Sequence, residues 1–180
     1  LATQLFNHCQ TAWNLTHNDH IHLLSACALH EIGLILSYKD HLNHGVYLLN
    51  NSELVGFEGN EGKLLVALIG NYQQNITLSD LEKQTAVHVN KAKQLLALLR
   101  VSIILSQRRI ETPLEYIESI EATAIIDDRQ ENGLSNVTPI HALQLTMSPA
   151  WLSNHPLIAY TLQQETTHLI PLGIKLTLVS

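Results

Sequence analysis

The hydrophobic pattern of the chain changes near residue 110, and no other feature of the sequence constrains the fold as much. Before that point, apolar residues recur at the spacing of amphipathic helices. Beyond it, residues 116–126 and 141–147 mostly alternate polar and apolar side chains, as half-buried strands do. The sequence therefore predicts a mainly α-helical chain, with a helical bundle over residues 1–110 and a small α+β domain over residues 111–180.

The segment before residue 110 divides into helices separated by polar breaks. Helices are predicted over residues 2–15, 20–36, 44–50, 62–72 and 87–107, with a capped turn over 77–81. Asn18 or Asp19 is expected to cap the second helix. The apolar face of that helix, which an amphipathic helix turns to the core, consists of Ile21, Leu24, Ala28 and Ile32. The helix over 87–107 is apolar almost all round, so we expect it to be the most buried.

The segment after residue 110 predicts the order β-β-α-β. Strands are expected over residues 116–126, 141–147 and 174–179, and a helix over 156–168. Asn154 is expected to cap this helix. The dipeptide Asn132-Gly133 favours a tight turn, so the first two strands should form a hairpin. In the second strand, Leu143 and Leu145 should point to the core.

Composition excludes several classes of protein. Hydrophobic residues make up 46% of the 180 residues and charged residues 14%, which rules out a disordered or low-complexity chain. The densest apolar stretch, residues 95–105, is interrupted by Arg100 and Ser102 and is too short to cross a bilayer, so no membrane role is expected. Aromatic residues are few and scattered, so we expect no base-stacking platform and no specific nucleic-acid partner.

The cysteines and the first residue set expectations about the cellular context. Cys9 and Cys27 lie in helical patterns, and we expect two buried free thiols, which fits a cytoplasmic protein. The sequence starts at Leu1, inside a helical pattern and without Met. We therefore expect the chain to be part of a longer protein.

The charges are distributed unevenly along the sequence. Residues 1–82 and residues 110–180 each carry eight acidic and two basic residues, whereas residues 83–109 carry six basic residues and no acidic one. This basic segment is where a polyanion would be attracted. The alternative is that its bases pair with acids on neighbouring elements or bind the carbonyls of a helix C-terminus. The six residues are Lys83, Lys91, Lys93, Arg100, Arg108 and Arg109.

Histidines are concentrated near the N-terminus, where seven of the eleven lie within the first 44 residues. The dyad His30-Glu31, followed by His44, suggests a hydrolytic metal site, because imidazole and carboxylate groups are common metal ligands. The alternative is that these histidines form hydrogen bonds with helix ends. No further acid completes the set, since Tyr72 and Gln73 occupy the exposed end of a helix where a ligand would be needed. With no nucleophile elbow or phosphate-binding loop either, we assign no catalytic residue and no metal ligand.

Several segments together resemble one known family. They are residues 26–34 (ACALHEIGL), 44–57 (HGVYLLNNSELVGF), 61–68 (EGKLLVAL), 78–81 (LSDL) and 95–109 (LLALLRVSIILSQRR). The chain is similar, over nearly its whole length, to the C-terminal half of the exopolyphosphatase and guanosine pentaphosphatase (Ppx/GppA) family. The resemblance implies an HD-like helical domain followed by a small α+β domain, which agrees with the helix-then-strand order.

The resemblance also implies a function divided between two parts of a protein. In the family, an N-terminal actin-like module cleaves terminal phosphates from polyphosphate or guanosine pentaphosphate with Mg²⁺ and acidic residues. The sequence contains no part of that module, so no cofactor is expected in this chain. The C-terminal half helps to form a basic channel for the polyanion and contributes to a homodimer. The implied partners are thus the chain's own N-terminal module, a second copy, and polyphosphate or guanosine pentaphosphate.

Two departures from the family pattern remove basic residues. Leu42-Asn43-His44 stands where family members have His-Arg-His, and residues 70–74 (GNYQQ) stand where they have Arg-Tyr-His-Arg-Lys. Each lost Lys or Arg removes a charge-assisted contact to phosphate, so polyanion binding should be weak. We interpret His30, Glu31 and His44 as a vestigial HD-like site. The basic residues expected to bind a polyanion are Lys93, Arg100, Arg108 and Arg109.

Three functions remain open on the sequence alone. The first is the non-catalytic C-terminal half of an exopolyphosphatase-like phosphatase, which binds a polyanion and dimerises and is inactive by itself. The second is a stand-alone HD-type metal phosphohydrolase. The third is a purely structural dimerisation module of a diverged paralogue. A bound metal ion distinguishes the second from the others, and polyanion affinity distinguishes the first from the third.

Overall fold

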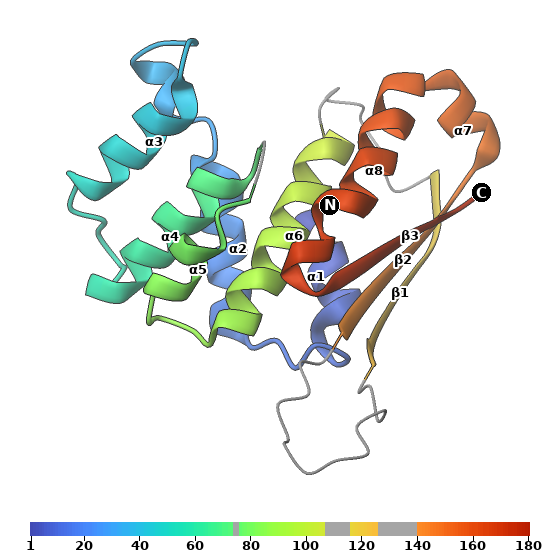
Figure 1. Ribbon diagram of the computed structural model, residues 1–180, viewed down its shortest axis with the longest axis horizontal. Coiled ribbons are helices and arrows are strands. Elements are labelled where there is room, and N and C mark those ends of the chain that lie inside the picture. The colour runs from blue at the N-terminus through green and yellow to red at the C-terminus, as the bar shows by residue number, and fades with distance from the viewer. Residues whose placement is uncertain (74–75, 107–115, 126–139) are drawn as a thin grey trace. The chain divides into compact units, whose positions relative to one another are not determined.

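The computed structural model describes residues 1–73, 76–106, 116–125 and 140–180 (Figure 1). The chain forms two compact units, one of residue 2 and residues 16–100, the other of residue 1, residues 3–15 and residues 101–180. The predicted boundary between residues 110 and 111 lies outside the described residues and stays a prediction. Helices dominate the described residues, and a small sheet forms near the C-terminus, so the predicted fold class is confirmed.

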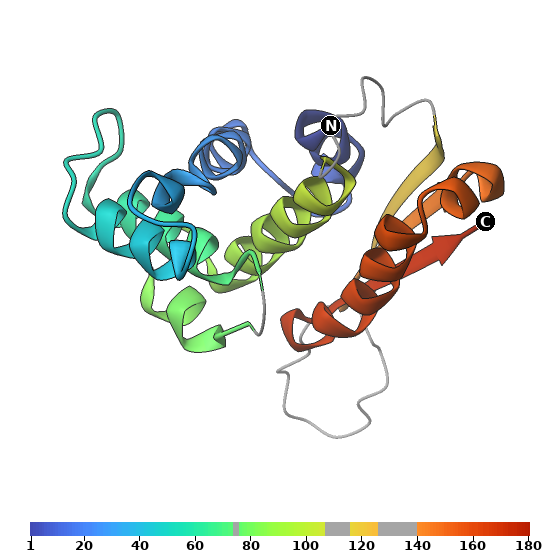
Figure 2. The same ribbon diagram turned by 90° about the horizontal axis from the view of Figure 1, so that it is seen from above.

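Residues 16–100 form an all-helical unit. Its elements are α2 (His17–Leu29), the 3₁₀ helix η1 (Ile32–Ile35), α3 (His41–Asn50), α4 (Gly59–Asn71), α5 (Leu78–Lys83) and the larger part of α6 (Val89–Ser106). α3 and α4 lie side by side in Figure 2 and form an antiparallel pair, with Val46 of α3 beside Gly70 of α4. α6 is buried all round over residues 95–101, as its apolar sequence predicts.

The N-terminus of α2 differs from the prediction. The N-cap is Thr16, not Asn18 or Asp19. The Thr16 hydroxyl accepts a hydrogen bond from Asp19 N at 3.3 Å, and Asp19 Oδ2 accepts one from Thr16 N at 2.6 Å. These reciprocal bonds form a capping box, so Asp19 belongs to the first turn of the helix.

The predicted apolar face of α2 is wrong. Ile21 and Leu24 are 43% and 41% exposed, whereas His22, Leu23 and Ala26 are buried. The physical reason is that the buried polar residues of α2 bind partners on other helices, so the helix can turn them to the core.

α2 also ends earlier than predicted, at Leu29, and a 3₁₀ turn follows it. A Cβ atom at Gly33 in this turn would clash with the carbonyl oxygen of His41 and lie 2.6 Å from Gly45 N. Glycine therefore lets the backbone of η1 approach α3 closely. The helices α3 and α4 each begin three residues earlier than predicted, and the capped turn at 77–81 is the start of α5.

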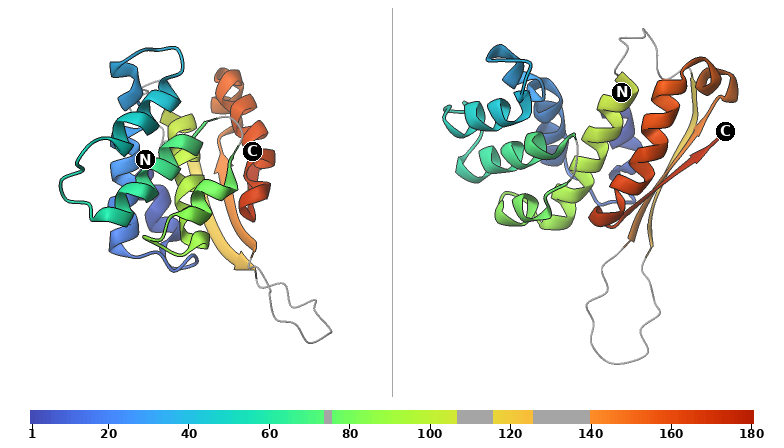
Figure 3. Two further views of the ribbon diagram at one scale, coloured as in Figure 1. Left: turned by 60° about the vertical axis from the view of Figure 1, so that its left-hand side comes forward. Right: turned by 45° about the horizontal axis from the view of Figure 1, so that its top comes forward.

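The other unit combines an N-terminal helix with a three-stranded sheet. Its elements are α1 (Ala2–Gln10), the end of α6, β1 (Ile117–Ile125), β2 (Ile140–Met147), α7 (Pro149–Asn154), α8 (Pro156–His168), the 3₁₀ helix η3 (Ile170–Leu172) and β3 (Ile174–Val179). The strand order is β1-β2-β3, with β1 and β2 antiparallel and β2 and β3 parallel. A parallel pair needs a crossover, which α7 and α8 supply. Figure 3 shows α8 running along the sheet.

The predicted β-β-α-β order is confirmed, with two corrections. The helix α7 was not predicted, and Asn154 is its last residue. The N-cap of α8 is His155, which makes no side-chain capping bond. Leu143 and Leu145 are buried, as expected, while the Asn132-Gly133 turn lies outside the described residues.

Candidate functional site

The basic segment contains a lysine that is already paired. Lys91 Nζ lies 2.9 Å from Asp19 Oδ2, which joins the first turn of α6 to the first turn of α2. The Asp19 side chain is 2% exposed and also accepts hydrogen bonds from Thr16 N and Thr16 Oγ1. Lys91 therefore neutralises a buried carboxylate, and little of its charge is left to attract a ligand.

The surroundings of Asp19 keep its carboxylate charged. Burial alone would raise the pKa of Asp19, but the hydrogen bonds from Lys91 and Thr16, together with the charge of Lys91, outweigh the burial. The pKa of Asp19 is thus lower than its usual value, and the ion pair holds α2 and α6 together around neutral pH.

Arg100 lies inside the helical unit. It is 3% exposed, and its Nη1 donates a hydrogen bond to the backbone carbonyl of Asn71, at the end of α4, at 2.8 Å. The carbonyl groups at a helix C-terminus lack partners within the helix, so the guanidinium satisfies one of them. This placement disfavours the predicted contact between Arg100 and a polyanion.

The other basic residues have different surroundings. Lys93 is half-buried and, among the described residues, has no ion-pair partner. Lys83 is exposed and lies 3.7 Å from Asp80, one turn earlier on α5. Arg108 and Arg109 lie outside the described residues. Within the described part of the chain, then, Lys83 and Lys93 are the members of the basic segment that are not buried or bound to a buried acid.

The imidazole of His30 closes the end of α2. Its Nδ1 donates a hydrogen bond to the carbonyl oxygen of Cys27 at 2.7 Å, and its Nε2 lies 4.0 Å from Glu31 Oε1. The ring meets the ring of Tyr72 edge to face, with centroids 5.3 Å apart. His44 is half-buried, and no hydrogen bond or ion pair joins it to His30 or Glu31 in the described structure.

A second histidine, His41, lies beside the same tyrosine and was not among the predicted site residues. His41 Nδ1 donates a hydrogen bond to the carbonyl oxygen of Tyr38, and Nε2 lies 3.2 Å from Tyr72 Oη. In the neutral imidazole, Nε2 is therefore the acceptor and the Tyr72 hydroxyl is the donor. The two consecutive helices predicted over residues 44–50 and 62–72 could have indicated this contact. If they pack antiparallel, the start of the first lies beside the end of the second.

Tyr72 is buried, not exposed as the sequence analysis expected. Its exposed fraction is 4%. Burial, assisted by the negative charge of Glu31, raises the pKa of Tyr72 to about 12, so the hydroxyl keeps its proton and donates to His41.

A polar cavity of about 280 Å³ opens beside this histidine. Its lining includes Asp40, His41 and Asn43 at the start of α3, and Asn43 Nδ2 donates a hydrogen bond to Asp40 Oδ1 at 2.7 Å. Among the residues that the structure describes, no Lys or Arg lines it, so these residues offer no fixed positive charge to hold a phosphate. The other lining residues are Leu42, Gly70, Gln73 and Thr77.

A further histidine–acid pair joins α2 to α4. His22 is 4% exposed, and its Nε2 lies 3.2 Å from Glu61 Oε1. Glu61 Oε2 also accepts a hydrogen bond from Glu58 N at the start of α4. That backbone bond, with a smaller contribution from His22, lowers the pKa of Glu61. This pair, like Asp19 and Lys91, holds helices together through a carboxylate that also caps a helix.

The described residues contain neither a candidate metal centre nor a membrane-spanning helix. They contain no group of three or more His, Cys, Asp and Glu side chains placed to hold a metal ion. Among them there is also no helix with the length and hydrophobicity needed to span a bilayer.

The family of the chain follows from comparison with known proteins. The sequence matches the family model described as Ppx/GppA phosphatase, domain III, over residues 1–166. The match covers all of α1 to α7 and most of α8, and it ends before β3. The chain belongs to the Ppx/GppA phosphatase family and contains its domain III.

Proposed function

We propose that this chain is the non-catalytic C-terminal part of an exopolyphosphatase-like phosphatase, which binds the polyanionic substrate weakly and contributes to a dimer. The observation that supports the non-catalytic assignment is the incomplete ligand set around His30, Glu31 and His44. His30 Nδ1 donates to the Cys27 carbonyl, so Nε2 is the nitrogen of His30 that could coordinate a metal, and no group of three or more His, Cys, Asp and Glu side chains among the described residues is placed to hold the same ion. A hydrolytic zinc site uses three protein ligands.

Hydrolysis would then occur in a separate actin-like module that uses Mg²⁺. That module is one partner of this chain, a second copy of the chain is another, and the substrate is polyphosphate or guanosine pentaphosphate. The proposed location is the cytoplasm. Family membership supports the module, the second copy and the substrate, and the two free cysteines support the location.

The proposed polyanion contact is made by Lys93 together with Arg108 and Arg109. Lys93 supports the proposal because it is accessible in part and has no ion-pair partner among the described residues. The chain as a whole carries a net charge of −6, which opposes the approach of a polyanion. Binding should therefore be weak and should fall steeply with salt.

An activity assay tests the non-catalytic assignment. Purified chain is incubated with polyphosphate or guanosine pentaphosphate and with Mg²⁺ or Mn²⁺, and released phosphate is measured. We expect no release above background. Phosphate release that is lost in Glu31→Ala and in His30→Ala would contradict the assignment and favour an HD-type metal phosphohydrolase.

A retention assay tests polyanion binding. The chain is applied to immobilised polyphosphate at low salt and eluted with a salt gradient. We expect the double variant Lys93→Glu, Arg108→Glu to lose retention, whereas Lys39→Glu, an exposed control on the loop before α3, should elute close to the unmodified chain. Equal retention of the double variant and the unmodified chain would favour a purely structural module.

A further inference from the structure

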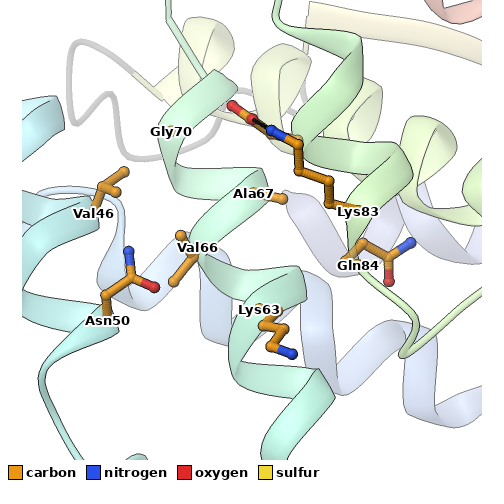
Figure 4. Close-up of a pocket in the computed structure, with 9 residues that line it drawn as sticks. Val46, Asn50, Lys63, Val66, Ala67, Gly70, Lys83 and Gln84 are labelled. Atoms are coloured by element: carbon orange, nitrogen blue, oxygen red, sulfur yellow. Dashed lines mark ion pairs between the residues drawn. The ribbon is translucent and has the colours of Figure 1, made fainter.

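A cavity of about 290 Å³ lies between α3, α4 and α5, inside the unit of residues 16–100 (Figure 4). Each helix lines it with residues three or four positions apart, which share one helix face. α3 contributes Val46 and Asn50, α4 contributes Lys63, Val66, Ala67 and Gly70, α5 contributes Asp80 and Lys83, and Gln84 directly follows α5. The cavity is thus formed by the packing of three helices.

One part of the lining is apolar. The side chains of Val46 and Val66 are half-buried and Ala67 is buried, so the cavity keeps apolar surface in contact with water. A Cβ atom at Gly70 would lie 3.2 Å from Val46 Cγ2, so glycine lets α3 and α4 close together at this end. An apolar group that covers this surface releases water and gains free energy.

The polar part of the lining has one uncompensated charge. Lys83 and Asp80 lie 3.7 Å apart and offset each other. The amide of Gln84 is used within its own loop, where Nε2 donates to the carbonyls of Leu81 and Val87 and Oε1 accepts from the backbone. Lys63 is exposed and has no ion-pair partner among the described residues.

A second cavity, of about 250 Å³, shares Asn50, Lys63 and Val66 with the first. Its remaining lining residues lie at the end of α3, in the loop after it and at the start of α4, and they are Leu49, Ser52, Leu54, Phe57, Gly59 and Gly62. Lys63 therefore stands where two partly apolar cavities meet. A single ammonium group between apolar surfaces matches a ligand with one anionic group and an apolar body.

We propose that these cavities bind a small organic anion, a carboxylate or phosphate monoester that carries a short aliphatic chain. Its anionic group pairs with Lys63. Its aliphatic chain covers Val46, Val66 and Ala67. This site is separate from the proposed polyanion contact, because a multiply charged phosphate chain gains nothing from apolar surface and finds one free cation here.

The test is an NMR titration of the ¹⁵N-labelled chain with hexanoate, hexyl phosphate, hexanol and inorganic phosphate. We expect hexanoate and hexyl phosphate to give saturable shifts of the Val66 and Gly70 amides, and inorganic phosphate to give none. Lys63→Ala should weaken hexanoate binding about fivefold, as expected for loss of one charge-assisted contact. Whichever of hexanoate and hexyl phosphate binds more tightly identifies the anionic group.

Matched variants distinguish binding at these cavities from the non-specific effect of removing a lysine. Lys39→Ala removes an exposed lysine outside both cavities and should leave binding unchanged. Val66→Phe should fill the cavity and abolish binding. If Val66→Phe does not fold, Lys63→Ala still tests the site, because Lys63 is exposed and its substitution leaves the chain folded. Absence of saturable shifts, equal binding of hexanol and hexanoate, or equal weakening by Lys39→Ala would overturn the proposal.

Discussion

Removal of the Asp19 carboxylate tests how the helical unit is held together. Three hydrogen bonds reach this group, from Thr16 N at 2.6 Å, Thr16 Oγ1 at 2.7 Å and Lys91 Nζ at 2.9 Å. Breaking a buried ion pair costs about 3–5 kcal/mol, and loss of a helix cap about 0.5–2 kcal/mol. The Lys91 side chain is 25% exposed, so it regains water in the variant and the loss falls at the lower end. We expect Asp19→Ala to lower the free energy of unfolding by about 3 kcal/mol.

The assay is urea unfolding followed by circular dichroism, with Lys91→Met and the double variant completing a cycle. We expect the two single losses to be strongly non-additive, with a coupling of about 2 kcal/mol. The control is Lys83→Met, which breaks a pair whose side chains are 75% and 45% exposed and should cost less than about 1 kcal/mol. If Asp19→Ala costs no more than this control, or if the cycle is additive, the reasoning is refuted.

The pH dependence supplies an independent check on the same carboxylate. The pKa of Asp19 is lowered in the folded chain, so its stabilisation is present above the unfolded pKa, about 3.9. It is lost as the pH falls from there through the folded value, because over that window the unfolded chain binds more protons than the folded one. The difference between the unmodified chain and Asp19→Ala should therefore shrink in strongly acidic solution.

Three further predictions concern single positions. Gly33→Ala should lower the free energy of unfolding by at least about 2 kcal/mol, because its Cβ would meet the backbone of α3. The control Gly59→Ala, whose Cβ would have nothing within 4 Å, should leave the free energy of unfolding unchanged, and thermal unfolding of both variants decides this. Tyr72→Phe should cost about 1 kcal/mol in urea unfolding by removing the hydrogen bond to His41, while the exposed Tyr160→Phe should not; equal effects would contradict the role of the hydroxyl. Burial lowers the pKa of His141, so stability should fall as the pH drops below about 6.5, and His141→Gln should remove that part of the pH dependence; an unchanged pH profile would exclude it.

The parts of the fold that follow from local periodicity were predictable. The apolar sequence of α6 and the alternation of Leu143 and Leu145 each reflect one element facing one core, so the sequence pattern and the buried positions agree. The places where a helix ends and the backbone closely approaches another helix were not predictable. α2 ends at Leu29, and the 3₁₀ turn after it brings Gly33 against the backbone of α3, a neighbour that is not visible in the local sequence.

The prediction of the buried face of α2 was wrong for a different reason. Hydrophobic periodicity treats Asp19 and His22 as surface residues, but each has a partner on a distant helix, Lys91 and Glu61 respectively. A paired or hydrogen-bonded polar residue can occupy a core position at little cost. Because the pairing partners are fixed by the fold, the rotation of such a helix about its axis cannot be obtained from its own sequence.

Charge counts along the sequence misplace the positive charge that a ligand can use. Two bases of the segment 83–109 are bound to groups far away in the chain, Lys91 to a carboxylate 72 residues earlier and Arg100 to a backbone carbonyl 29 residues earlier. Lys63, by contrast, lies in the acidic segment 1–82, yet it lines a cavity and has no ion-pair partner among the described residues. Attraction depends on charge left uncompensated in three dimensions. A binding site for an anion in this chain is therefore better sought at Lys63 or Lys93, which have no ion-pair partner among the described residues, than at Lys91 or Arg100.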